Sequence, residues 1–389
     1  MRRVFVCGHF NFPRGGATSN YIQYFGAALT MAGNEVHLIT TKNKEYCQSD
    51  EYKGIHIHEI KFDDRKIASY IDFKTGLKNK IITVLQQLKP TSKDIIVIYS
   101  HNLWLHKALQ KYGRENCVKV GSIVVEYFSS EDYKNGRFDL EYIKNRFLNL
   151  HVIPYEDFVF PISSYIRDKF SNGIAKQMVL PIMADPYEFQ YIPKEVCDTK
   201  RFIFPANGKM KDALCNMVLA IMSVLKNEQL DVEFHFCGIK EKDLRRYANL
   251  NQSQTLDKRI IIHKWLEYDE LVELYKKMHF LLLARDVTEM TKANFPSKVP
   301  ELMCYGVVPI VSRVGDYTKY YLENGKDCIV MNGSSVSIIS DAIYYGCHLT
   351  NEQYKRMSNN ARKLAEDRFW YGVWAEKIDT FMEKLYGNS

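Results

Sequence analysis

The chain has 389 residues, of which 46% are hydrophobic and 25% are charged, which suits two ordinary domains and excludes a largely disordered chain. No apolar run reaches the roughly 20 residues that span a bilayer. The net charge of +7 suits an anionic ligand or membrane surface, but no dense basic stripe indicates nucleic-acid binding.

The N-terminal part alternates short β-rich runs with helix-period segments, which predicts βαβ units and a parallel sheet. Met1–His9 lacks the long apolar region and cleavage site of a signal peptide, so we expect a cytoplasmic protein. The first helix is expected over 20–32, with Gly33 as its stop. The predicted strands are Arg3–Cys7, Glu35–Thr40, Ile55–Ile60, Asp94–Ser100, Lys119–Val125 and Phe158–Ile162.

Two basic amphipathic stretches lie between these strands, at 74–89 and 133–151. Both are expected to cover a face of the sheet, as such helices usually do. Contact with an anionic membrane that carries a lipid-linked acceptor stays open as the alternative.

A proline-bearing segment, Leu180–Lys194, is the expected domain boundary, and a second alternating series follows it. We expect an N-terminal domain over 1–185, completed by a returning helix within 369–389, and a C-terminal domain over 199–368. The second series of strands is expected at Arg201–Pro205, Asp231–Cys237, Arg259–His263, His279–Ala284, Val307–Val311 and Cys328–Met331.

Nine cysteines are scattered without CxxC spacing, which is typical of reduced, packed cysteine and predicts neither a disulfide framework nor a zinc site. Neither an Asp-x-Asp motif nor a His/Cys cluster suggests a bound metal ion, so no metal is expected. No cofactor is expected either.

The loop after the first strand, Phe12–Asn20, contains Gly15 and Gly16 just before a helix. Glycines permit close approach of the backbone, and the helix start presents free N–H groups, so a phosphate could bind here. An ordinary glycine-containing turn explains the loop equally well. The spacing is not GxGxxG, which disfavours dinucleotide binding.

A second motif runs from Asn294 to Ser312 and reads as a loop, a short helix, a glycine stop and a buried strand. Ser297 suits the N-cap of the helix, and Gly306 suits its C-terminal stop. Glu301 would then lie near the helix start, where a carboxylate could accept hydrogen bonds from both hydroxyls of a ribose. The plainer alternative is a glutamate that only favours the helix dipole.

Together these motifs resemble the glycosyltransferase group 1 family of retaining, sugar-nucleotide-dependent enzymes. The residues that carry the resemblance are Pro13, Gly15, Gly16, Ala17 and Asn20 in the first motif, and Phe295, Pro296, Ser297, Lys298, Glu301, Leu302, Met303, Gly306, Pro309, Ile310, Val311 and Ser312 in the second. The resemblance implies the GT-B fold, an α/β fold of two facing, doubly wound Rossmann-like domains with a C-terminal helix that crosses back to the first.

By position, the resemblance assigns the Gly15–Gly16 loop to the donor diphosphate and the acceptor, and Glu301 to the donor ribose. Ser297 and Lys298 of the same motif fall to the donor as well. The family's first glutamate would stand eight positions before Glu301, where this chain has Ala293. Branches of the family with a P-x-K-x-x-E pattern lack that glutamate too, and the chain looks like one of them.

The family places an arginine and a lysine after the first strand of the second domain, where they clamp the donor phosphates. This chain has no arginine there, but Lys211 resembles the family lysine and Lys209 could replace the arginine. Two solvated lysines on a loop are the plainer alternative. The clamp would neutralise the charge that builds on the leaving diphosphate.

Several further residues stand at the ends of predicted strands, where α/β sheets bind ligands. His101 matches a family histidine near the transferred sugar, and with Lys211 it is a candidate catalytic residue. Glu126 and Arg14 are candidates for the acceptor side, and Arg285 for a phosphate contact.

The expected function is therefore retaining, metal-independent transfer of a hexosyl or related sugar from a nucleoside-diphosphate sugar. The resemblance implies a glycan or lipid-linked acceptor, in cell-surface polysaccharide or lipopolysaccharide synthesis, at the cytoplasm or peripherally on the cytoplasmic membrane face. Two alternatives stay open: a sugar-nucleotide epimerase or hydrolase on the same fold, and a catalytically degenerate transferase that serves as a partner subunit.

Overall fold

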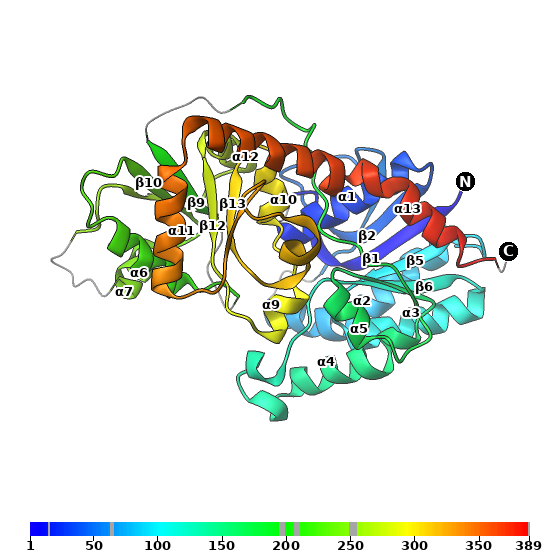
Figure 1. Cartoon of the computed structure of the whole chain (residues 1–389). Coiled ribbons are helices and arrows are strands. Elements are labelled where there is room, and N and C mark those ends of the chain that lie inside the picture. The colour runs from blue at the N-terminus through cyan, green and yellow to red at the C-terminus, as the bar shows by residue number, and fades with distance from the viewer. Residues whose placement is uncertain (15, 63–65, 194–198, 206–210, 249–254, 388–389) are drawn as a thin grey trace. The chain divides into compact units, whose positions relative to one another are not determined.

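The computed structural model describes residues 1–14, 16–62, 66–193, 199–205, 211–248 and 255–387. The chain divides into unit 1, Met1–Met183 with Tyr371–Ser389, and unit 2, Ala184–Trp370 (Figure 1). Both units are parallel α/β layers, as the sequence predicts. Among the described residues, no helix combines the length and the apolar character needed to cross a membrane.

Unit 1 is built on a sheet of order β3-β4-β2-β1-β5-β6-β7-β8, in which every pairing except β3 with β4 is parallel. Its strands are β1 (Arg3–Phe12), β2 (Glu35–Lys42), β3 (Glu51–Tyr52), β4 (Ile55–Glu59), β5 (Ile95–Tyr99), β6 (Lys119–Val124), β7 (Phe158–Pro161) and β8 (Lys176–Gln177). Its helices are α1 (Ala17–Met31), α2 (Lys66–Leu88), α3 (Leu103–Asn116), α4 (Leu140–His151), α5 (Ser164–Lys169) and α13 (Tyr371–Glu383).

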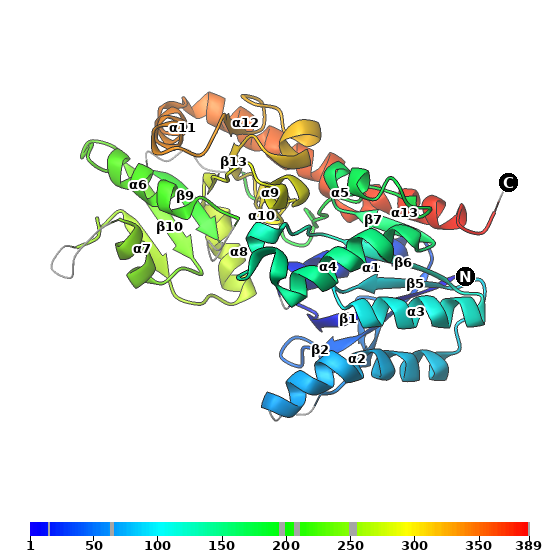
Figure 2. The ribbon, with the colours of Figure 1, turned by 90° about the horizontal axis from the view of Figure 1, so that it is seen from below.

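Apolar side chains cover both faces of this sheet. Helices α2 and α3 lie on one face, where Leu77, Ile81 and Leu105 pack against strand residues (Figure 2). The stretch at 74–89 therefore covers the sheet, as expected. On the other face α13 lies against α1, and its Phe381 contacts Phe160 of β7 with ring centroids 5.2 Å apart (Figure 1). The predicted returning helix is thus part of unit 1.

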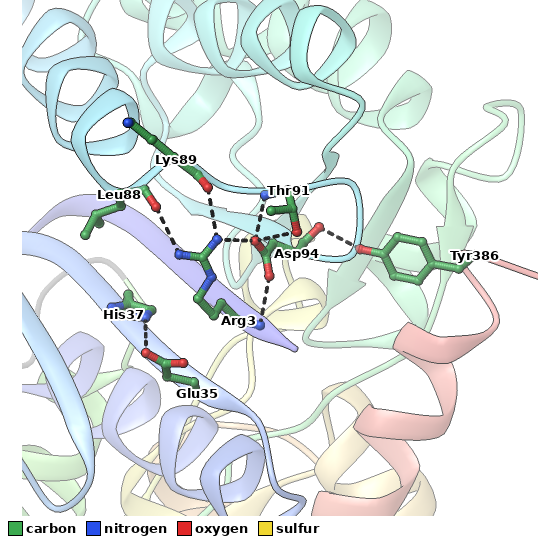
Figure 3. A network of polar contacts seen from close by, with 8 residues as sticks. All are labelled: Arg3, Glu35, His37, Leu88, Lys89, Thr91, Asp94 and Tyr386. Atoms are coloured by element: carbon green, nitrogen blue, oxygen red, sulfur yellow. Dashed lines mark hydrogen bonds and ion pairs between the residues drawn. The ribbon is translucent and has the colours of Figure 1, made fainter. Parts of the chain in front are cut away.

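Asp94, just before β5, connects residues near the N-terminus and near the C-terminus of the chain, both of which belong to unit 1 (Figure 3). Arg3 donates from Nη2 to Asp94 Oδ2 at 2.6 Å, and Thr91 donates its backbone N–H to the same oxygen at 2.7 Å. The hydroxyl of Tyr386, beyond α13, donates to the Asp94 carbonyl at 2.6 Å. Burial by itself raises the pKa of Asp94, but the hydrogen bonds from Arg3 and Thr91 outweigh it and lower the pKa.

Unit 2 is a second parallel sheet, of order β11-β10-β9-β12-β13-β14. Its strands are β9 (Lys200–Pro205), β10 (Val232–Cys237), β11 (Ile260–His263), β12 (Phe280–Leu283), β13 (Val308–Ser312) and β14 (Ile329–Met331). Its helices are α6 (Leu214–Val224), α7 (Glu241–Tyr247), α8 (Tyr268–Lys277), α9 (Glu289–Ala293), α10 (Lys298–Met303), α11 (Val336–His348) and α12 (Asn351–Leu364).

A row of aromatic rings crosses the middle of the unit 2 sheet. Phe202 of β9 stacks on Phe234 of β10 at 5.1 Å and on Phe280 of β12 at 5.0 Å, and Tyr354 of α12 closes the row at 5.4 Å from Phe280. Since these rings are buried, they fix β9 between β10 and β12. That placement makes β9 and β12 neighbours whose connections leave in opposite directions, the arrangement at which doubly wound sheets bind ligands.

Candidate functional site

The candidate donor region of unit 2 lies at the carboxyl ends of β9 and β12. These are the neighbouring strands whose connections leave in opposite directions, and we call their junction the change in strand order. Lys211 and Asp212 follow β9, and Arg285 follows β12. Lys209, the other predicted clamp residue, lies outside the described residues. The parallel register of β9 and β12 brings their two loops together, as the sequence predicts for strand ends.

Arg285 joins these loops by a buried network. Its Nε donates to Asp212 Oδ1 at 2.8 Å, and its Nη1 donates to Asn294 Oδ1 at 2.9 Å. Its backbone N–H donates to Ser312 Oγ at 3.0 Å. The side chains of Arg285 and Asp212 are only 8% and 6% exposed. Arg285 therefore braces the loop that carries Lys211, a role that sequence reasoning missed, and its contact with phosphate stays a prediction.

The Asn294–Ser312 motif folds as expected at its C-terminal end. The N–H of Val307 donates to the carbonyl of Leu302 at 3.2 Å, and that of Gly306 donates to Met303 at 2.9 Å. This pair of bonds is the Schellman ending, which requires the left-handed φ of 67° that Gly306 adopts. A Cβ there would also lie 2.7 Å from the Ser358 hydroxyl. Both the backbone conformation and the lack of space therefore require glycine.

The N-terminal end of the motif differs from the prediction. Ser297 stands at the N-cap position, but its side chain makes no capping hydrogen bond. The reason is local: Ser297 already has helical dihedrals, φ −60° and ψ −27°, whereas a capping side chain needs an extended backbone. The expected cap is therefore wrong, and the part of Ser297 in donor binding stays a prediction.

Lys298 and Glu301 form an ion pair on the first turn of α10. Nζ of Lys298 donates to both carboxylate oxygens of Glu301, at 3.1 and 2.9 Å, and to the Tyr275 hydroxyl at 3.3 Å. The pair is partly exposed, at 27% and 17% of the two side chains. Each carboxylate oxygen retains a further lone pair, so Glu301 can still accept hydrogen bonds from hydroxyl groups.

The surroundings of this ion pair are buried and apolar. Tyr275 is fully buried, and burial, reinforced by the charge of Glu301, raises its pKa. Burial also raises the pKa of Cys237, at the end of β10, to about 12, although the charge of Lys298 opposes the rise. Tyr275 and Cys237 therefore stay protonated near neutrality, and the Lys298–Glu301 pair supplies the charge of this turn.

In unit 1 the change in strand order lies between the neighbouring strands β1 and β5. Gly16, at the N-cap of α1, has φ 113°, which explains the glycine by backbone freedom alone. Arg14 has a left-handed φ of 55° in the same loop, and Gly15 lies outside the described residues. The helix begins at Ala17, three residues before the expected start.

The other predicted residues of unit 1 follow β5 and β6. His101 is exposed at the end of β5, with its ring 6.0 Å from that of Phe128. Glu126 follows β6, close enough to Tyr99 to affect its charge: burial raises the pKa of Tyr99 to about 12, the hydrogen bond with Thr18 opposes the rise, and Glu126 adds to it. Arg14, Gly16, His101 and Glu126 therefore share one edge of the unit 1 sheet.

A buried network beneath the His101 loop was not anticipated. Nε2 of His106 donates to the carbonyl of Ser100 at 2.8 Å, and Nδ1 shares a 2.8 Å hydrogen bond with Glu156. The Ser122 hydroxyl donates to the other oxygen of Glu156. His106 lies one turn into helix α3, which Asn102 caps. This position was the only sequence feature that could have predicted the network.

Among the described residues, no group of three or more His, Cys, Asp or Glu side chains is placed to hold a metal ion. In unit 2, Lys211 lies on the loop that Arg285 and Asp212 brace, and Glu301 lies on the first turn of α10. A lysine can bind an anionic group, and a carboxylate can accept hydrogen bonds from hydroxyl groups.

Sequence and structure comparisons show which known proteins this chain resembles. Residues 193–364 match the family model described as glycosyl transferases group 1. No curated protein matches the chain at a significant level of sequence similarity. Among solved structures, the sucrose-phosphate synthase of Thermosynechococcus elongatus has a TM-score of 0.75 at 12% identity, with 100% of both chains covered.

Two further solved structures share the fold. HepE of Anabaena, in complex with UDP and glucose, has a TM-score of 0.72 at 11% identity, over 99% of this chain and 100% of that one. The apo lipopolysaccharide outer core galactosyltransferase WaaB has a TM-score of 0.63 at 13% identity, over 99% of each chain. At such low identities these likenesses establish the GT-B class of fold. The match to the glycosyl transferases group 1 model covers residues 193–364, which is most of unit 2.

Proposed function

We propose that the chain transfers a hexosyl or related sugar from a nucleoside-diphosphate sugar to a glycan or a lipid-linked acceptor. The observation that carries the proposal is the joining of the Lys211 loop to Arg285 at the change in strand order of unit 2, inside the segment that matches the family. A ligand that binds at this edge meets a cation on a loop whose position is fixed by a buried ion pair.

In the proposed donor site, Lys211 neutralises the leaving diphosphate, and Glu301, oriented by Lys298, accepts hydrogen bonds from the ribose hydroxyls. Gly16, Ser297, Lys298 and Arg285 are further candidates for donor contacts, as are Gly15 and Lys209 outside the described residues. Transfer proceeds with retention and without a metal ion or cofactor. The bond from the sugar to the diphosphate breaks, the acceptor oxygen bonds on the same face, and its proton passes to a diphosphate oxygen.

Glu126 and Arg14 are the proposed acceptor-side residues, and His101 is the proposed catalytic residue near the transferred sugar, together with Lys211. The proposed class of acceptor rests on the similar fold of WaaB, which is named as a lipopolysaccharide outer core galactosyltransferase. On this basis we place the activity in cell-surface polysaccharide or lipopolysaccharide synthesis.

A thermal-shift screen of nucleoside-diphosphate sugars tests the donor first, since a ligand that binds the native state raises the melting temperature. The stabilising donor is then incubated with and without glycan acceptors, and the anomeric configuration of the product is read by NMR, with and without EDTA. We expect a retained linkage that forms only with acceptor and survives EDTA. Turnover without acceptor indicates an epimerase or hydrolase, and binding without turnover indicates a degenerate partner subunit.

A further inference from the structure

Helix α4 of unit 1 carries most of its apolar side chains on the outside. Leu140, Ile143, Phe147 and Leu150 are 71%, 48%, 42% and 39% exposed. The stretch at 133–151 was expected to cover the sheet, and for this helix that expectation is wrong. Figure 2 shows α4 beside α3, and of its residues only Leu148 and Asn149 are buried.

The buried side of α4 contains amide groups, and its exposed side contains an apolar arc. Asn149 donates to Asn145 at 2.7 Å, and Asn145 donates to the Tyr133 hydroxyl at 2.9 Å, so amide groups occupy the side turned to the protein. At about 100° per residue, the four exposed apolar residues lie within about 80° of one another. An amphipathic helix whose apolar face points outward is expected to have a partner.

The exposed apolar surface extends beyond the helix itself. Phe138, in the 3₁₀ turn before α4, is 89% exposed, and Trp104 of α3 is 53% exposed. Nζ of Lys107 lies 4.9 Å from the ring centroid of Phe147 and 5.7 Å from that of Trp104, which places both rings beside one cation. We call these six residues the α4 face: Trp104, Phe138, Leu140, Ile143, Phe147 and Leu150.

Cations border the α4 face on both sides. Arg146 lies about 40° beyond one edge of the apolar arc and Lys144 about 40° beyond the other. On α3, Lys107, Lys111 and Arg114 share the exposed side of the helix with Trp104. The acidic groups of α4 are used elsewhere: Asp139 caps the helix, and Glu141 lies behind Lys144 and pairs with it at 3.2 Å.

We propose that the α4 face docks on an anionic lipid surface, with its apolar side chains between the acyl chains and the bordering cations among the headgroups. Aromatic and aliphatic residues flanked by lysine and arginine are the composition of helices that lie in the membrane interface. A second copy of the chain is a poorer occupant, because cations border both edges and would meet cations in an isologous contact. The proposal stands on unit 1 alone, whether or not the chain transfers sugar.

Co-sedimentation of the full-length protein with vesicles tests the proposal. We expect binding to phosphatidylglycerol-containing vesicles, and weaker binding to pure phosphatidylcholine. The double variant Ile143→Ser/Phe147→Ser should lower the partition coefficient about tenfold or more, because two large apolar side chains no longer leave water. Ile174→Ser, at a site 78% exposed in the same unit, is the matched control and should bind as the parent does.

A pair of charge-reversal variants tests the electrostatic contribution to vesicle binding. Lys144→Glu/Arg146→Glu should abolish the preference for phosphatidylglycerol, whereas Lys355→Glu/Arg356→Glu on α12 should keep it. Melting curves check that each variant folds, and binding of the stabilising nucleoside-diphosphate sugar should be unchanged. The proposal fails if the parent ignores both vesicle types, or if the serine pair binds vesicles as well as the parent. It also fails if that pair only converts a dimer into a monomer.

Discussion

Lys211 stands one residue before Asp212, whose carboxylate is tied to Arg285. If Lys211 meets the leaving diphosphate, Lys211→Ala should slow transfer about 10²–10³-fold, the usual effect of losing one preorganised charge contact in a transition state. Lys211→Arg should recover part of the rate. The measurement is kcat with the identified donor, and Lys226→Ala, at an exposed lysine, is the control. Turnover within threefold of the parent would remove Lys211 from the site.

Glu301 is predicted to recognise ribose, and its carboxylate is oriented by Lys298. Glu301→Gln should weaken binding of the nucleoside diphosphate by about 1.5–3 kcal/mol, because hydrogen bonds to a charged acceptor are lost. Calorimetry with the nucleoside diphosphate and its 2′-deoxy form sharpens the test. The parent should discriminate between the two ligands and the variant should discriminate less. Equal discrimination by both proteins would place the ribose elsewhere.

At the scale of the elements, the Arg285–Asp212 pair holds the β9–α6 and β12–α9 loops together. Asp212→Asn leaves a buried guanidinium without its counter-charge, so we expect a loss of about 3–5 kcal/mol in the free energy of unfolding. Urea unfolding measures this loss.

The same variant distinguishes two roles for Arg285. If Arg285 acts as a brace, Asp212→Asn should also lower kcat, because the Lys211 loop is no longer fixed. If Arg285 instead binds phosphate, its release from Asp212 should leave donor affinity equal or higher. Unchanged stability together with unchanged kcat would contradict the bracing role.

At the scale of the whole molecule, each unit contains a buried histidine that resists protonation. Burial lowers the pKa of His37, in unit 1, and of His235, in unit 2, from 6.5 to about 4, although Glu35 and Glu233 oppose the shift. Between these pH values the unfolded chain binds protons that the folded chain does not. The free energy of unfolding should therefore fall as the pH drops from about 6.5 to about 4.

Urea unfolding at about pH 7 and about pH 5 measures this dependence. His37→Gln and His235→Gln should each reduce the loss of stability on acidification, because one group that takes up protons on unfolding is gone. The exposed His348 provides a control, since His348→Gln should keep the loss of the parent. A larger loss in either buried-site variant would contradict the assignment.

Much of the fold follows from local pattern. Apolar runs of strand length and the glycines at 33 and 306 predict the parallel sheets and two helix ends, because glycine adopts a left-handed φ without the steric cost that a side chain brings. The first two strands were predicted too short: β1 runs to Phe12 and β2 to Lys42, because Asn11 and Phe12 pair with Thr41 and Lys42 after a shift in register. That pairing depends on a partner strand, which local pattern does not reveal.

The sequence by itself determined that the chain is two parallel α/β layers with polar candidates at the strand ends, since periodicity and strand polarity are local properties. The tertiary structure alone decided how those candidates are used. It buried Arg285 against Asp212 and Asn294, and it turned the apolar side of α4 outward. A helical pattern indicates that an apolar face exists, but only the packing of neighbouring elements decides whether that face meets the core or the solvent.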